Sequence, residues 1–201
     1  MNAWLKTGWG VHVFLLIVLL QGCAGTDFVR PNANALELGK TTPAQIVAQM
    51  GEPKSRGVVK KDGTLIDSMT YVYASIGGEP ADKGVTPTRV QVFFFYNDIL
   101  VGREFQSSFK SDSSNFDETK IALLEEGKTS RADVIRIFGE PTGAYIAPVV
   151  EEGTREAIGY AYQAIRGGPF SGMKIFQKVL RISFDENSIV SKVEYVSTDT
   201  D

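Results

Sequence analysis

The clearest hydrophobic pattern in the chain is an apolar stripe at helical spacing that occurs twice. The phrases GKTTPAQIVAQMGEP, at 39–53, and GKTSRADVIRIFGEP, at 127–141, share their opening Gly-Lys-Thr and their closing Gly-Glu-Pro. Apolar residues three and four positions apart form one face of each segment, as in an amphipathic helix. The stripes consist of Ile46, Val47 and Met50 in the first segment and of Val134, Ile135 and Phe138 in the second.

Capping residues define the ends of both predicted helices. Thr42 and Ser130 stand at the N-cap, each with a polar residue three positions later, and a Gly-Glu-Pro sequence ends each segment. Shorter apolar segments at 32–38 and 117–126 precede them and predict a first helix in each half. Each half of the chain is therefore expected to begin with two short helices.

Downstream of each helix the apolar period changes from about 3.6 to 2, which predicts strands. MTYVYAS at 69–75 matches IGYAYQA at 158–164, and hairpins are predicted at 89–108 and 179–198. The sequence thus predicts an α+β fold of two tandem helix–helix–three-strand (ααβββ) units with antiparallel sheets. The predicted domain bounds are 1–22 for a signal peptide, 23–31 for a lipidated cysteine and tether, 32–108 for the first unit, 109–116 for a linker and 117–201 for the second unit.

The first 22 residues have the features of a secretory signal. Lys6 precedes an apolar run from Val11 to Leu20, which is too short to span a bilayer as a mature helix. The run ends in LQGC, which looks like a bacterial lipobox and predicts cleavage between Gly22 and Cys23 with acylation of Cys23. Several acyl chains would anchor the protein stably. The alternatives are an ordinary cleaved signal and an uncleaved membrane anchor.

Composition narrows the classes of function. Cleavage before Cys23 would remove Lys6 and the single histidine, His12, and would leave 24 acidic residues against 20 of the 21 basic ones. This acidic balance predicts no binding to nucleic acid. Without histidine or a free thiol, the mature chain lacks Ser–His and Cys–His pairs and the usual zinc ligands. We therefore expect no metal, no cofactor and no catalytic residue, and interpret the adjacent glutamates at 125–126 and 151–152 as solvated charge.

The lipobox, the helix phrase at 39–53, TYVY at 70–73 and GVTPTRVQVFFFYN at 84–97 occur in this order along the chain. Together they resemble the BamE-like (SmpA/OmlA) family of outer-membrane lipoproteins. The resemblance implies an accessory of the machinery that inserts β-barrel proteins into the outer membrane, acting by binding partners rather than by catalysis. The tandem arrangement is also similar to that of β-lactamase inhibitor protein, which grips its target with a concave sheet.

Comparison of the two halves predicts a surface that could bind a partner. At an offset of 90 residues, the apolar positions of 90–94 align with those of 180–184. The residues that alternate with them in the second half are all polar, whereas in the first half the same positions are occupied by Gln91, Phe93 and Phe95, two of which are aromatic. An apolar sheet face usually contacts something. Phe93 and Phe95 are therefore expected either to anchor a partner protein or to pack on the other half or the linker.

The loop predicted at 165–177 supplies two further candidates for partner binding, Phe170 and Met173. It combines flexible glycines with large apolar side chains, a composition typical of binding loops. The alternative is that the loop places these side chains on the core.

These observations favour a non-catalytic protein that is anchored to the outer membrane by the lipid on Cys23. Its domains are expected to face the periplasm or, alternatively, the cell surface. Two functions stay open: a scaffold or assembly accessory that binds envelope proteins, and an inhibitor or sensor of an envelope enzyme. An enzymatic role is the least favoured, since histidine and a free thiol are absent from the mature sequence.

Overall fold

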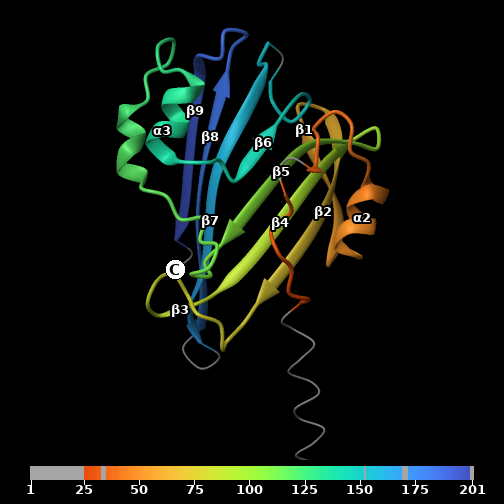
Figure 1. Cartoon of the computed structure of the whole chain (residues 1–201), viewed down its shortest axis with the longest axis vertical. Coiled ribbons are helices and arrows are strands. Elements are labelled where there is room, and N and C mark those ends of the chain that lie inside the picture. The colour runs from red at the N-terminus through yellow and green to blue at the C-terminus, as the bar shows by residue number, and fades with distance from the viewer. Residues whose placement is uncertain (1–24, 33–34, 152, 169–171, 200–201) are drawn as a thin grey trace, which may run out of the picture.

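The computed structural model describes residues 25–32, 35–151, 153–168 and 172–199. The predicted signal peptide, Gly22, Cys23 and Phe170 lie outside these ranges. The described strands form one antiparallel sheet in the order β1-β2-β4-β5-β6-β7-β8-β9, and β3 pairs with β7 beside this path (Figure 1). The strands are β1 (Ser55–Lys61), β2 (Thr64–Ala74), β3 (Val85–Thr86), β4 (Thr88–Tyr96), β5 (Ile99–Ser107), β6 (Gly143–Tyr145), β7 (Glu156–Gly168), β8 (Gly172–Phe184) and β9 (Val190–Asp199).

The predicted fold class, two ααβββ units, is wrong. Strands account for 48% of the structure and helices for 14%, and the nine strands form one curled half-barrel. The two halves are joined through β6, which pairs with β5 on one side and with β7 on the other. Within the described residues, the α-helices are α2 (Pro43–Met50) and α3 (Arg131–Phe138). The first helix expected in the second half is a short 3₁₀ helix, η2 (Glu118–Leu123).

Both α-helices begin and end where their capping residues predict. The hydroxyl groups of Thr42 and Ser130 accept hydrogen bonds from the third helical residue, whose side chain bonds back to the cap backbone. Gly51 and Gly139 follow the last helical residues at φ angles of 79° and 83°, a region that glycine enters without steric cost. Within the described ranges, no helix is long and apolar enough to cross a membrane.

The two halves keep the same attachment of helix to sheet. Tyr71 of β2 donates a 2.8 Å hydrogen bond to the carbonyl oxygen of Gly51, just after α2. Tyr160 of β7 donates an equivalent 2.8 Å bond to the carbonyl oxygen of Gly139, just after α3. The sequence repeat therefore corresponds to a repeated local structure, even though the strands belong to a single sheet.

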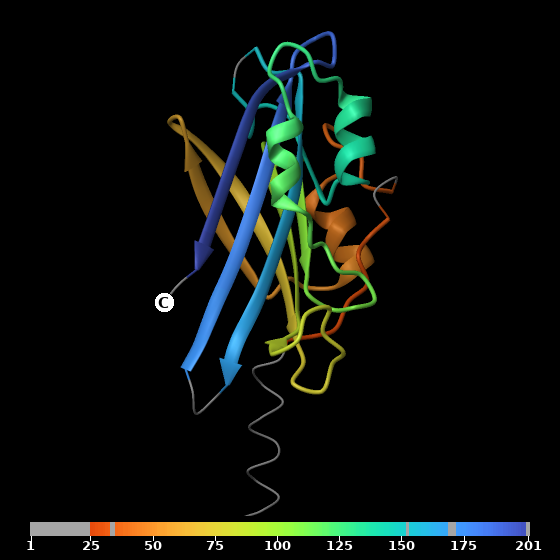
Figure 2. The ribbon, with the colours of Figure 1, turned by 90° about the vertical axis from the view of Figure 1, so that its left-hand side faces the viewer.

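The described helices α2, η2 and α3 lie on one face of the sheet, and the edge strands β1 and β9 curve away from them (Figure 2). Ile46 of α2 and Val134 of α3 are fully buried in separate apolar clusters beneath the two helices. Burying an aliphatic side chain of this size contributes about 1.5–3 kcal/mol. The helix-covered face therefore forms the main core, and none of the described helices covers the opposite, concave face.

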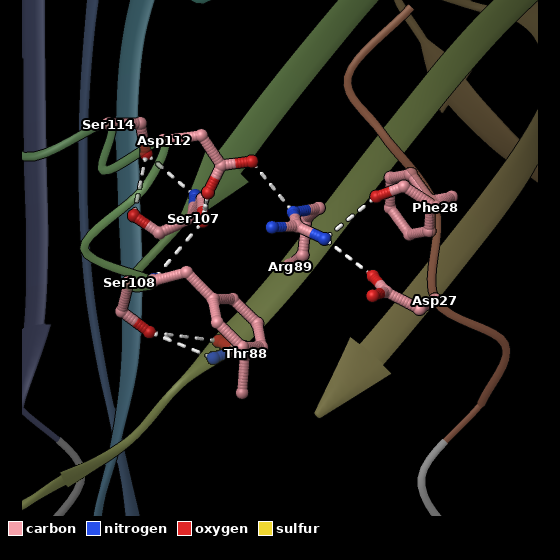
Figure 3. Close-up of polar contacts among 9 residues, drawn as sticks. Asp27, Phe28, Thr88, Arg89, Ser107, Ser108, Asp112 and Ser114 are labelled. Carbon is pink, nitrogen blue, oxygen red and sulfur yellow. Dashed lines mark hydrogen bonds and ion pairs between the residues drawn. The ribbon is translucent and has the colours of Figure 1, made fainter. Parts of the chain in front are cut away.

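The segment 25–30, predicted to belong to a tether, is held on the sheet. Gly25 forms a β-bridge with Tyr73 near the end of β2. Arg89 of β4 donates to the carboxylate of Asp27 at 2.6 Å and to the carbonyl oxygen of Phe28 at 2.8 Å (Figure 3). We call this segment the strap.

The linker predicted at 109–116 is bound to the same arginine. Asp112 accepts a 2.8 Å hydrogen bond from Arg89 Nε and a 2.6 Å bond from the hydroxyl of Ser107 (Figure 3). The ring of Phe109 lies 4.6 Å from Arg89 Cζ, within the range of a cation–π contact. One buried guanidinium group thus joins the strap, β4 and the segment between the two halves.

Candidate partner-binding face

The predicted anchors Phe93 and Phe95 do not form a surface. Both are buried beneath α2, with 0% and 1% of their areas exposed, in a cluster that includes Ile46 and Leu100. The interpretation that they form an exposed partner-binding surface is wrong, and the alternative, packing on the other half or the linker, does not hold either, since the buried members of this cluster all belong to the first half. The 90-residue offset is one residue too large along this strand.

The correct offset follows from the strand pairing. Tyr71 lies opposite Gln91, and its counterpart Tyr160 lies opposite Leu180, so β4 and β8 are related by 89 residues. Phe93 is then the equivalent of a core residue of β8. A shift of one residue moves every side chain of a strand to the other face. The face left open is therefore the concave one.

The proposal that Phe170 and Met173 bind a partner remains a prediction. The segment 165–177, expected to be a loop, is mostly a long hairpin in which β7 extends to Gly168 and β8 begins at Gly172. Met173 lies opposite Gly167 in this hairpin, and its side chain is not among those described. Phe170 lies outside the described residues.

Small residues form the floor of the concave face. Ala157, Gly159 and Ala161 alternate along β7 on this side of the sheet, and Tyr145 of β6 lies opposite Ala157. A Cβ atom added to Gly143 would lie 2.8 Å from the Tyr145 hydroxyl oxygen, and one added to Gly159 would lie 3.0 Å from its ring. Glycine at these positions lets the fully buried ring lie against the strands.

A chain of polar side chains crosses this floor from β5 to β8. The hydroxyl of Tyr145 donates to Glu104, and Gln106 donates to the other carboxylate oxygen of Glu104 at 2.6 Å. Gln177 of β8 donates to the side-chain oxygen of Gln106 at 3.3 Å. Arg181 Cζ lies 4.6 Å from the centroid of the Tyr145 ring. We call these five residues the polar cluster.

The electrostatics of the polar cluster favour recognition of a polar group. Burial raises the pKa of Tyr145 well above its usual value, the negative charge of Glu104 raises it further, and Arg181 partly opposes both. Tyr145 therefore stays protonated and acts as a hydrogen-bond donor. The buried Nε of Arg181 has no hydrogen-bond partner among the described residues. Such a donor is costly unless a partner is supplied.

A loop closes one end of the concave face. Val149 and Val150 are buried there against Ile66 of β2 and Tyr145. Lys61 of β1 donates to the carbonyl oxygen of Val149, so the edge hairpin holds this loop in place. On the other side, Lys192 of β9 and Glu151 form a 2.6 Å ion pair across the same loop. The loop therefore joins both walls of the curled sheet.

Exposed valines border the concave face. Val59 of β1 lies opposite Ile66, on the concave side, and 47% of its area is exposed. Val196 of β9 lies opposite Val179 and is 61% exposed. Exposed apolar side chains on both edge strands are a feature that a protein partner could cover.

Sequence reasoning did not identify the polar cluster. The signal nearest to it is the order GREFQS at 102–107, in which Glu104 and Gln106 alternate with the buried Phe105. Polar residues at alternate positions of a strand ordinarily indicate a solvated face. Here both are buried, because Tyr145 and Gln177 contact them from β6 and β8.

Comparisons with known proteins give little guidance. No protein-family profile matches the chain, and no curated protein is significantly similar to it. Among solved structures, it is similar to a candidate beta-lactamase inhibitor protein from Streptococcus mutans, with 16% sequence identity and a TM-score of 0.40. The alignment covers 92% of this chain and 97% of that chain. The resemblance to the BamE-like family gains no support from these comparisons.

The described residues also contain no group of three or more histidine, cysteine, aspartate or glutamate side chains placed to hold a metal ion.

Proposed function

We propose that the protein is a non-catalytic lipoprotein of the bacterial outer membrane whose concave sheet face binds an envelope protein. The observation that supports this most is the concave face itself, which no described helix covers: Val59 and Val196 are exposed on its edge strands, and the partly buried Arg181 of the polar cluster lies between them. On the other face, the apolar residues beneath α2 and α3 are buried in the two core clusters.

The lipid anchor is proposed from the lipobox and acts through the strap. Gly25 already pairs with Tyr73, and only Ala24 separates it from Cys23. Two residues of extended chain span about 7 Å. A lipid on Cys23 would therefore hold the sheet close to the membrane surface, on the periplasmic side in this proposal. The partner is then a protein embedded in, or bound near, the same membrane.

The polar cluster indicates what the partner would present. The side chain of Arg181 is only partly buried, and a backbone carbonyl, an amide or a carboxylate of an inserted loop would accept hydrogen bonds from its guanidinium group. If the partner were an envelope enzyme that loses activity when bound, the protein would be its inhibitor. A structural partner would make it an assembly accessory.

Site-specific photo-crosslinking in cells tests the proposed face. A photoreactive residue at Val59, on the concave side of β1, is expected to form an adduct with one discrete protein. The neighbouring position, Val58, is the matched control: it is 59% exposed and points to the opposite side of the same strand. Adducts from Val58 with none from Val59 would place the partner elsewhere and refute the proposal.

A further inference from the structure

Three arginines surround a small cleft on the helix-covered face of the sheet. Arg30 comes from the strap, Arg103 from β5 and Arg131 from the first turn of α3, and the cleft has a volume of about 220 Å³. Its floor includes Ala144, the residue of β6 that faces this side between Arg103 and Ile158.

The position of the cleft follows from the layout of the helices. The α2 cluster covers β2, β4 and β5, and the α3 cluster covers β7, β8 and β9. The short strand β6 lies between these two clusters and presents only Ala144 to this face. The cleft therefore exists because α2 and α3 each cover the strands of their own half, and no described helix covers β6, the strand that joins the halves.

The guanidinium groups are fixed in place by their surroundings. Arg30 donates a 2.9 Å hydrogen bond to the carbonyl oxygen of Pro141, and its Cζ lies 5.2 Å from the centroid of the Phe105 ring. Arg103 donates to the carbonyl oxygen of Leu36 at 3.5 Å. These contacts orient the two guanidinium groups at the cleft.

Two carboxylates lie near the cleft and must be counted with the arginines. Glu156 Oε1 lies 3.0 Å from Arg131 Nε, close enough for an ion pair, although the alignment is not that of a hydrogen bond. Glu140 lines the cleft and is exposed. A third carboxylate, Asp112, also acts on Arg30 and pairs with Arg89. Among the residues that line the cleft, three guanidinium groups stand against the one carboxylate of Glu140, so the lining carries a net positive charge.

The environment makes this positive charge unfavourable as it stands. Burial lowers the pKa of Arg30, and the charges of Asp112 and Glu140 only partly oppose this. Burial also lowers the pKa of Arg103, and the positive charge of Arg30 lowers it further. An anion in the cleft would attract both arginines and so offset the repulsion between them.

We propose that this cleft binds a small oxyanion, a phosphate group, between the guanidinium groups of Arg30, Arg103 and Arg131. Arginine matches phosphate oxygens with pairs of parallel N–H donors, which a compact ammonium group does not offer. A cleft of about 220 Å³ holds a phosphate group but not a large ligand. The site lies on the face opposite the polar cluster, so it does not depend on the proposed partner.

Calorimetric titration of the full chain in neutral detergent with inorganic phosphate, at constant ionic strength in chloride, tests this site. Saturable binding of one phosphate per chain is expected. Arg30→Met and Arg103→Met should each weaken it by about tenfold, the effect of losing one charged hydrogen bond. The matched control is Arg56→Met, which removes an exposed arginine that pairs with Glu52 outside the cleft, and its affinity should equal that of the wild type.

A second variant and a second ligand make the result decisive. Arg103→Lys keeps the charge and the fold but removes the paired donors, so its affinity should also fall below that of the wild type. A short-chain phosphatidic acid titrated in the same way separates a lipid headgroup from free phosphate, and binding of either one at the arginines supports the site. No saturable binding of either ligand, or equal binding by the Arg30, Arg103 and Arg56 variants, would overturn the proposal.

Discussion

Replacing Phe93 by aspartate is expected to unfold the protein rather than to remove a binding surface. The side chain is fully buried beneath α2, so the change deletes a large apolar group and places a carboxylate in the core. Removing a buried phenylalanine costs about 3–5 kcal/mol, and an unpaired buried charge adds to this. The loss is comparable with the whole stability of an ordinary domain. Thermal denaturation followed by circular dichroism measures it.

The matched control for this prediction is Val58→Asp. Val58 is 59% exposed on an edge strand and lies opposite Asp67, so the same charge there should lower the free energy of unfolding by no more than about 1 kcal/mol. A folded Phe93→Asp variant with the melting temperature of the wild type would show that Phe93 is not a core residue.

Arg89→Met is expected to destabilise the protein by about 2–4 kcal/mol and to free the strap. The side chain is buried, and its loss leaves Asp112 without its charged partner while the exposed Asp27 returns to water. Breaking a buried ion pair by removing one partner costs about 3–5 kcal/mol, and the exposure of Asp27 reduces this figure. Thermal denaturation gives the loss of stability, and hydrogen exchange reports on the backbone of residues 25–30.

The two readouts for Arg89 separate its role from general destabilisation. Amides of the strap should exchange faster in Arg89→Met than in the wild type. The amides at the centre of β8 should exchange in the same relative order in both proteins. Arg56→Met removes an exposed pair with Glu52 and should cost less than about 0.5 kcal/mol without changing the strap. Unchanged exchange of the strap in Arg89→Met would contradict the proposed attachment.

Local structure could be predicted from the sequence where the signals are local. The two α-helices follow from capping boxes and closing glycines that act within a few residues of each other. The tyrosine strands follow from period 2 in the same way. Both Tyr71 and Tyr160 were found on the side of the sheet that packs against the helix of their own half.

The single sheet could not be predicted in this way, because it depends on pairings between distant segments. The strand β6 has only three residues, too few to show any period, yet it joins β5 to β7. The edge strand β1 is almost wholly exposed, so it lacks the alternation of apolar and polar residues that marks a half-buried strand. The pairing of β6 with β5 and β7, together with that of β3 with β7, turns the expected pair of separate sheets into one.

The concave face, which we propose as the binding surface, was not predicted from the sequence for a related reason. The turn of the first hairpin is one residue shorter than that of the second, so β4 and β8 are related by 89 residues while β5 and β9 are related by 90. That one residue decides whether Phe93 faces the core or the concave side. The polar cluster requires Glu104, Tyr145 and Arg181 to meet from three strands, which no local pattern encodes.

The affinity of the crosslinked partner for two valine variants of β1 tests the central claim most directly. Val59→Arg places a charge at the edge of the concave face, and Val58→Arg places the same charge on the other side of the strand. We expect Val59→Arg to weaken partner binding by about tenfold or more and Val58→Arg to leave it unchanged. Equal affinities of the two variants, or a loss confined to Val58→Arg, would contradict a partner on the concave face.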